Sequence, residues 1–463
     1  MLFPTVDFLM FFLVVAGVVA TLDRHFETKK ALLVIASYFF YAQWDWRFCF
    51  LLGFSTAVSY AAGLLIAATQ EAARRRAFLT AGVAIHLGLL GIFKYFDFFV
   101  VSANELAHTL GLERELPFLE IILPVGISFY TFHGISYIAD VYRGEVGVCR
   151  RPVDMLLYMS FFPQLVAGPI VRAAYFLPQL ERPAAEAIPI AAALLLILGG
   201  LFKKVVIASY LATELVDPVF AAPTSYGGPD LILGVYGYAV QIYCDFSAYS
   251  DMAIGLAALL GFRFPPNFAQ PYRSQRLREF WQRWNMSLSF WLRDYLYKPL
   301  GGNRAGRLMT YRNLMITMLL GGLWHGAAWT FVLWGGFHGA GLVAEHALGG
   351  RISLPRWLRW FVFFHLIVFS WILFRSQSVA LAGEFLGQLT VPGSPTLWTL
   401  PVVLAIAAVI GLQLLPTDAV ERVQVWIERR RPLALATALS AVIIVTGATV
   451  SGQGVAPFIY FRF

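Results

Sequence analysis

Two short runs in the middle of the chain carry side chains that suit proton transfer. The run LWHG at 323–326 places His325 in apolar sequence, and the run FWQRWN at 280–285 ends on Asn285. A buried imidazole near its neutral form accepts a proton at physiological pH. A carboxamide does not, but it donates a hydrogen bond to a developing negative charge. The two residues are 325 − 285 = 40 positions apart, which one short helix and a loop would span.

The histidines have a structural interpretation as well. From these residues alone, His325 is either a proton acceptor or a hydrogen-bonded core residue, and the latter is the commoner case. His338 follows in the run GGFHG, and we expect a structural role for it. We expect the same of His86, His133 and His365.

Composition predicts an all-α polytopic membrane protein. Of the 463 residues, 59% are hydrophobic and 13% charged, and the mean hydropathy is +0.68. A soluble domain carries roughly 25% charged residues. The net charge of +8 fits basic cytoplasmic loops and does not require nucleic acid as a partner. The cysteines are widely spaced, so we expect neither a disulfide scaffold nor a metal site.

Apolar runs predict about eleven to thirteen membrane-embedded segments, interfacial and re-entrant helices included. The first is expected to be a retained span, since no basic segment precedes it. Residues 155–179 are expected to form a re-entrant hairpin, because Pro163 and Pro169 interrupt an apolar run. The predicted spans are 8–22, 31–41, 47–69, 80–101, 118–138, 188–211, 231–260, 314–323, 327–346, 360–373, 400–415 and 434–450.

Basic loops predict the orientation of these spans. The loops at 23–30, 71–76 and 143–151 fall on one side if the intervening segments each cross once. The positive-inside rule places that side in the cytoplasm and the N-terminus outside. Residues 421–431 form a further basic loop, which we also expect to be cytoplasmic.

The stretch 273–312 predicts an amphipathic interfacial helix. It holds nine Lys or Arg residues against two acidic ones. Trp284, Leu288, Trp291 and Tyr295 recur at spacings of four, three and four, which places them on one helix face.

The predicted span 231–260 carries an unusual polar patch. Asp245, Tyr249 and Asp251 lie inside this apolar run, where charged groups face protein or water. They line a cavity or join helices through hydrogen bonds, and the sequence leaves both interpretations open.

Six runs together resemble the membrane-bound O-acyltransferase superfamily. The chain has no phosphate-binding loop, dinucleotide fingerprint or GxSxG motif, which argues against an ATP-driven pump and a serine hydrolase. The six runs are more similar to those of the bacterial alginate O-acetylation branch than to those of the teichoic acid D-alanylation branch. They are LPVGISFYTF at 123–132, FFPQLVAGPI at 161–170, YCDFSAYSD at 243–251, FWQRWNMSLS at 280–289, LRDYLYKPLGGNR at 292–304 and GLWHGA at 322–327.

The resemblance implies which residues form the active site and where the catalytic core lies in the chain. His325 corresponds to the family's near-invariant histidine and Asn285 to its partner. Many bacterial relatives have histidine at the second position, so the asparagine here disfavours a two-histidine mechanism. The resemblance implies a single membrane domain, 1–463, with a catalytic core at about residues 120–346, and no tightly bound cofactor or metal.

The implied activity is O-acyl transfer in the bacterial inner membrane. An acyl group, expected to be acetyl, would come from cytoplasmic acetyl-CoA or an acyl-carrier thioester. It would cross to extracytoplasmic partner proteins that esterify a polysaccharide such as alginate. The candidates for donor binding, or for plain positive-inside charge, are Arg283, Arg293, Lys298 and Arg304. The alternatives are D-alanyl transfer from a carrier protein, and a polysaccharide or lipid-linked sugar transporter.

Overall fold

The computed structural model contains two compact units, and the described residues form helices and loops without a strand. Unit 1 comprises Met1–Ile188 and Ala257–Pro265, and unit 2 comprises Pro189–Leu256 and Pro266–Phe463. The structure describes residues 3–416, apart from 23, 113–115, 120, 167, 183–189 and 350–353, together with residue 422. The single domain expected over 1–463 stays a prediction.

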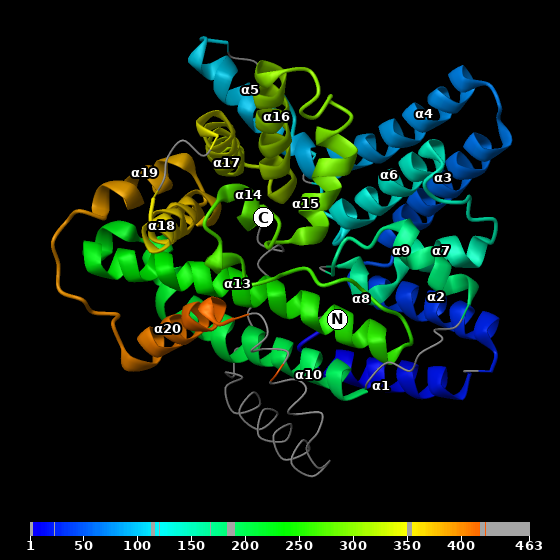
Figure 1. Ribbon diagram of the computed structural model, residues 1–463, viewed down its shortest axis with the longest axis horizontal. Coiled ribbons are helices and arrows are strands. Elements are labelled where there is room, and N and C mark those ends of the chain that lie inside the picture. The colour runs from blue at the N-terminus through cyan, green and yellow to red at the C-terminus, as the bar shows by residue number, and fades with distance from the viewer. Residues whose placement is uncertain are drawn as a thin grey trace. The chain divides into compact units, whose positions relative to one another are not determined.

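Unit 1 is built around helix α6, which is buried on nearly every face. Helices α3 and α4 run beside it (Figure 1). A helix that is buried all round needs internal partners for its polar groups, and Ser136 of α6 bonds the carbonyl of His133 at 3.0 Å. The helices of unit 1 are α1 Val6–Thr21, α2 Phe26–Ala42, α3 Phe48–Ala68, α4 Ala72–Leu90, the π-helix η1 Gly91–Tyr95, α5 Phe96–Thr109, α6 Ile127–Arg143, α7 Pro152–Ser160, α8 Phe162–Leu165 and α9 Ala173–Glu181.

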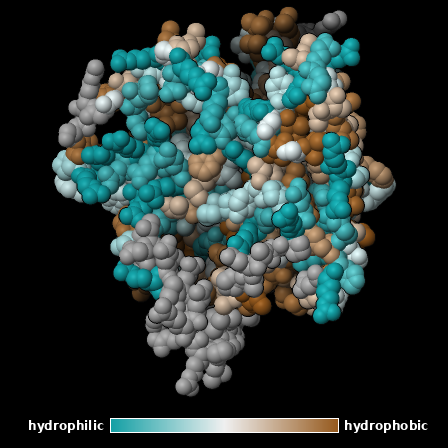
Figure 2. Space-filling model, turned by 45° about the vertical axis from the view of Figure 1, so that its right-hand side comes forward, coloured by the Kyte–Doolittle hydropathy of each residue, from teal (hydrophilic) through white to brown (hydrophobic). Residues whose placement is uncertain are grey.

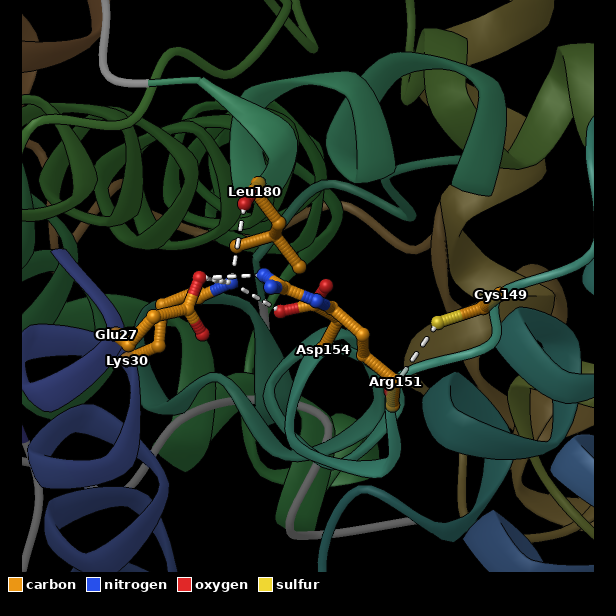
Figure 3. Close-up of polar contacts among 6 residues, drawn as sticks. All are labelled: Glu27, Lys30, Cys149, Arg151, Asp154 and Leu180. Atoms are coloured by element: carbon orange, nitrogen blue, oxygen red, sulfur yellow. Dashed lines mark hydrogen bonds and ion pairs between the residues drawn. The ribbon is translucent and has the colours of Figure 1, made fainter.

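A buried lysine ties α2 to α7 and α9 within unit 1. The Lys30 amino group is fully buried and lies 2.6 Å from Asp154, 3.0 Å from Glu27 and 3.1 Å from the Leu180 carbonyl. Figure 3 shows it between these oxygens, with Arg151 also bonded to Glu27. A buried ammonium group is tolerated only when its N–H donors are hydrogen-bonded or ion-paired. This cluster therefore holds α2, α7 and α9 together.

Unit 2 contains a long helix, α13, and a tight pair, α16 and α17, with α18 against α17 (Figure 1). Its helices are α10 Ile190–Leu201, η2 Phe202–Ala208, α11 Ser209–Leu211, η3 Ala212–Val216, α12 Asp217–Ala221, η4 Pro223–Ser225, α13 Gly228–Leu259, η5 Pro271–Arg273, α14 Leu277–Trp281, α15 Met286–Leu292, η6 Arg293–Tyr297, α16 Arg307–His325, α17 Trp329–Leu348, α18 Arg356–Arg375, α19 Val379–Gln388 and α20 Leu400–Leu414.

Four helical segments of the described chain are long and apolar enough to cross a bilayer. They are Phe48–Ala68, Ala72–Thr109, Ile190–Ala221 and Arg356–Arg375. The predicted span 118–138 is helical only from Ile127, where α6 begins, because the preceding residues LPVG include Pro124 and the left-handed Gly126. The remaining predicted spans within the described residues contain helices that are shorter or more polar. Large apolar side chains also face outward, such as Leu9, Met10 and Leu13 of α1, each more than half exposed. Figure 2 shows one face of the molecule, on which hydrophobic patches lie beside hydrophilic ones.

Two segments of the chain are divided into short helices in the structure. The run expected to be re-entrant is divided into the short helices α7, α8 and α9, with breaks at Phe161, at 166 and at 168–172. The continuous amphipathic helix expected within 273–312 is wrong, because α14 ends at Trp281 and α15 begins only at Met286. Nothing is described for the predicted span 434–450, and of the loop 421–431 only residue 422 is described.

Candidate active site

His325 is the last residue of α16 and is buried, with 3% of its surface exposed. Three aromatic rings surround its imidazole: Trp324 at 5.1 Å, Trp334 at 5.2 Å and Phe374 at 5.2 Å between centroids. Such packing restricts the ring to few orientations. The position combines a fixed imidazole with an environment that excludes most water.

Close approach of α16 and α17 explains the glycines around the histidine. A Cβ on Gly322 would lie 2.2 Å from the Phe331 carbonyl oxygen, and one on Gly326 would lie 2.1 Å from the Phe331 ring. Neither position can hold a larger residue without moving the helices. Small residues allow helices in membranes to pack this closely, so the GLWHG sequence encodes the turn that presents His325.

Asn285 lies in the break between α14 and α15. Its backbone is left-handed, with φ 39° and ψ 58°, a conformation that asparagine tolerates better than most residues. It is 2% exposed, and its Nδ2 has no hydrogen-bond partner among the described residues. A buried amide donor without an acceptor is costly, which marks this N–H as a candidate contact for a bound oxygen.

The proline-rich connector 265–272 holds this break in place. Asn267 accepts from the Met286 amide through its carbonyl at 2.9 Å, and from the Ser287 amide through Oδ1 at 3.0 Å. Further along, the Ala269 amide donates to the Arg283 carbonyl at 2.9 Å. The sequence indicated only a non-helical connector here. An asparagine between prolines was the available signal of a local hydrogen-bonding role.

Aromatic packing joins the two runs that the sequence singled out. Trp281 packs 5.7 Å from Trp334, which itself contacts His325. Trp284, directly before Asn285, lies 5.0 Å from Trp371. Aromatic contacts within unit 2 therefore connect the two runs through Trp334 and Trp371, and the shared catalytic role of Asn285 and His325 stays a prediction.

The other histidines make identifiable contacts. His338 is fully buried; its Nε2 lies 3.2 Å from the Ser370 hydroxyl and its ring 4.6 Å from Trp334. In unit 1, His86 lies between two serines, Ser55 at 3.3 Å and Ser59 at 2.8 Å.

His133 and His365 have different surroundings. The His133 ring is buried at 5.6 Å from Tyr158 within unit 1. In unit 2, His365 donates through Nδ1 to the carbonyl of Phe361, one turn earlier in α18, at 2.7 Å.

The four candidate donor-binding cations are mostly engaged by nearby groups. Arg283 pairs with Glu279 at 3.0 Å. Arg293 and Lys298 converge on the Asp294 carboxylate at 2.9 and 2.7 Å, and the hydrogen bond to Asp294 raises the pKa of Arg293. Arg304 is exposed. Arg283 lies just before α15, Arg293 and Lys298 lie in and after η6, and Arg304 lies in the turn beyond it.

The polar patch of α13 forms ion pairs with η2. Asp245 lies 2.7 Å from Lys204, and both are buried. Asp251 lies 2.5 Å from Lys203, which also donates to Ser247 at 2.9 Å. Tyr249 lies beside Lys204, 5.9 Å from its amino group to the ring centroid. This geometry favours the interpretation of Asp245 and Asp251 as links between helices.

Sequence comparison identifies the class of protein in which these residues occur. Residues 151–381, which include Asn285 and His325, match the profile of the membrane-bound O-acyltransferase family. The probable alginate O-acetylase AlgI of Pseudomonas aeruginosa is 46% identical over 363 residues, 76% of this chain and 68% of that protein. The chain belongs to the membrane-bound O-acyltransferase family.

Two further relatives show the range of named activities within the family. The peptidoglycan O-acetyltransferase of Helicobacter pylori is 37% identical over 76% of this chain and 71% of its own length. The teichoic acid D-alanyltransferase of Bacillus subtilis is 29% identical over 55% of this chain and 69% of its own length. This membrane-bound O-acyltransferase is therefore more similar to these two O-acetyltransferases than to this D-alanyltransferase.

Proposed function

We propose that this O-acyltransferase moves an acetyl group from a cytoplasmic thioester across the inner membrane for O-acetylation of an exopolysaccharide such as alginate. The observation that carries the proposal is the pair of buried groups on the family's motifs. His325 is held in an aromatic cage, and Asn285 presents an amide N–H without a protein acceptor among the described residues. The 46% identity to an alginate O-acetylase supports acetyl as the group and alginate as the acceptor class.

The proposed chemistry divides between the two residues. A ring nitrogen of His325 takes the proton of the acceptor hydroxyl as its oxygen attacks the acyl carbonyl carbon. The Asn285 N–H donates to the oxygen that becomes negative. The carbon–sulfur bond then breaks, and the proton passes from His325 to the departing thiolate. The products are an ester and a free thiol.

The donor and the partners follow from the same proposal. Acetyl-CoA or an acylated carrier protein would approach the basic surface of Arg283, Arg293, Lys298 and Arg304, whose charge attracts phosphates and acidic proteins. The acyl group would leave to an extracytoplasmic partner protein that modifies the polysaccharide.

The test is transfer in reconstituted vesicles. Radiolabelled acetyl-CoA on the cytoplasmic face should deliver label to the outer face with the wild type. With His325→Gln the rate should fall by about 10² to 10⁴. His365→Gln replaces a histidine of α18 that bonds the Phe361 carbonyl, and it should behave as the wild type. Transfer undiminished in His325→Gln would overturn the assignment of the base.

A second arm separates the acyl donors. The same vesicles receive carrier protein charged with labelled D-alanine in place of acetyl-CoA. Transfer from this donor alone would replace acetyl by D-alanyl in the proposal. Transfer from neither donor would argue against both thioesters as direct substrates.

A further inference from the structure

We propose that Asn267 is a positioning residue for acyl transfer, which acts by holding the carboxamide of Asn285 in its reactive place. The proposal rests on the proposed function. Asn267 is itself 2% exposed and belongs to the connector 265–272, outside the run that carries Asn285. Its role follows from three hydrogen bonds that its backbone and side chain make around that run.

Asn267 bonds both amides that follow Asn285. Its main-chain carbonyl accepts from Met286, and its Oδ1 accepts from Ser287. These are first-turn amides of α15, which have no partner within their own helix. Asn267 thus caps α15 from another segment, because Asn285 makes no side-chain capping bond of its own.

The cap leaves the Asn285 side chain available. An asparagine that begins a helix ordinarily accepts from the amides two or three positions later. Here the Ser287 amide is already bonded to Asn267. The Asn285 Oδ1 instead accepts from the Ser287 hydroxyl at 3.5 Å, which leaves its Nδ2 to other acceptors. Its Nδ2 is buried and lacks a partner among the described residues, as required of a donor held for a substrate oxygen.

Asn267 is also oriented by a third bond. Its Nδ2 donates to the hydroxyl of Ser250 on α13 at 3.1 Å. The Oδ1 and the Nδ2 of Asn267 are therefore both bonded to protein groups. It acts through Asn285, and the polar face of α13 contributes to the site through Ser250.

The experiment is a double-mutant cycle on transfer kinetics. We expect Asn267→Ala to lower kcat by about 10- to 100-fold, since small misplacements of a catalytic group are costly, and to change KM for acetyl-CoA by less than about twofold. Asn285→Gly removes the carboxamide while permitting the left-handed backbone. If Asn267 acts through that carboxamide, the double variant should be no slower than Asn285→Gly alone.

A matched control separates positioning from folding. Asn104 of unit 1 also pins a loop, through reciprocal bonds with the Leu116 backbone at 2.9 and 3.2 Å. Asn104→Ala should lower the melting temperature and leave kcat per folded molecule unchanged. Two results would overturn the positioning role alone. One is a double variant, Asn267→Ala with Asn285→Gly, whose fold-loss in kcat is the product of the two single losses. The other is an Asn267→Ala enzyme that is as fast as the wild type. A wild type that transfers no acyl group would overturn the proposed function and this proposal with it.

Discussion

The indole of Trp334 lies 5.2 Å from the imidazole of His325, with the two ring planes at 89°. In this edge-to-face arrangement the aromatic pair gains about 0.5 to 1.5 kcal/mol beyond the burial of its surface. Trp334 is 1% exposed and also contacts Trp281, which precedes the Asn285 break. The orientation of the proposed base therefore depends on a residue that is absent from both of the runs first singled out.

Replacing Trp334 should impair both stability and transfer. Trp334→Leu leaves a cavity and removes the ring edge, so we expect a loss of about 2 to 3 kcal/mol in unfolding free energy and about a tenfold lower kcat. Trp334→Phe keeps an aromatic neighbour and should lose less of each. Thermal unfolding in detergent and vesicle transfer measure the two effects. A Trp334→Leu protein with wild-type kcat would show that the ring does not orient His325.

His338 should behave as a structural residue. Its Nε2 bonds the Ser370 hydroxyl inside an aromatic cluster. We expect His338→Gln to lower stability by about 1 kcal/mol and to leave the pH dependence of kcat unchanged. Ser370→Ala, which removes the same hydrogen bond, is the companion variant and should match it. A shifted or flattened pH profile in His338→Gln would instead indicate a second proton-transfer group.

The sequence predicted the helices of unit 2 better than the site between them. The apolar runs at 314–323 and 327–346 correspond to α16 and α17. Such helices are predictable because their buried positions are occupied by apolar residues. Trp284, Leu288 and Trp291 continued the same period across residues 282–285, so periodicity predicted one helix where the structure has a break. Hydrophobic spacing carries no signal for a single left-handed residue such as Asn285.

The contacts that complete the site join residues distant in sequence. Asn267, which lies outside the six runs, bonds Ser250 of one run and Ser287 of another. The pairing of Lys204 with Asp245 likewise joins two helices. A single sequence shows that such polar groups are present in apolar runs, but not which of them meet. A single sequence therefore indicates two chemical candidates, which stay predictions, but not the residues that hold them in place.

The two ion pairs between η2 and α13 should differ sharply in their effect on stability. Lys204 and Asp245 are each about 2% exposed, so Lys204→Met leaves a buried carboxylate without its cation and should cost about 3 kcal/mol. Lys203 and Asp251 are partly exposed, and Lys203→Met should cost less than about 1 kcal/mol.

A double variant tests the origin of that difference. Lys204→Met with Asp245→Leu removes both buried charges and should recover most of the lost stability. Melting temperatures in detergent compare the three variants with the wild type. Equal losses for Lys204→Met and Lys203→Met would contradict the argument from burial.

Cys149 offers a test of the predicted orientation. It lies between α6 and α7, in the basic loop 143–151 expected on the cytoplasmic side. Burial raises the pKa of its thiol to about 11, and the thiolate is the reactive form. In a Cys49→Ser, Cys244→Ser background, a membrane-impermeant thiol reagent should therefore label Cys149 slowly at neutral pH. The rate should rise about tenfold per pH unit until the pH approaches that pKa.

The side of labelling decides the topology. Inside-out vesicles should label at Cys149 and intact right-side-out vesicles should not. The segment 71–76 predicted as a loop is helical from Ala72, where α4 begins. Arg74→Cys, placed in the same background with Cys149→Ser, samples this helix end and should label from the same side as Cys149, since two predicted crossings separate them. Because that cysteine would be exposed, it should react quickly and serve as a positive control for access. Labelling of either position from outside would reverse the orientation and place the acyl donor on the wrong face for the proposed transfer.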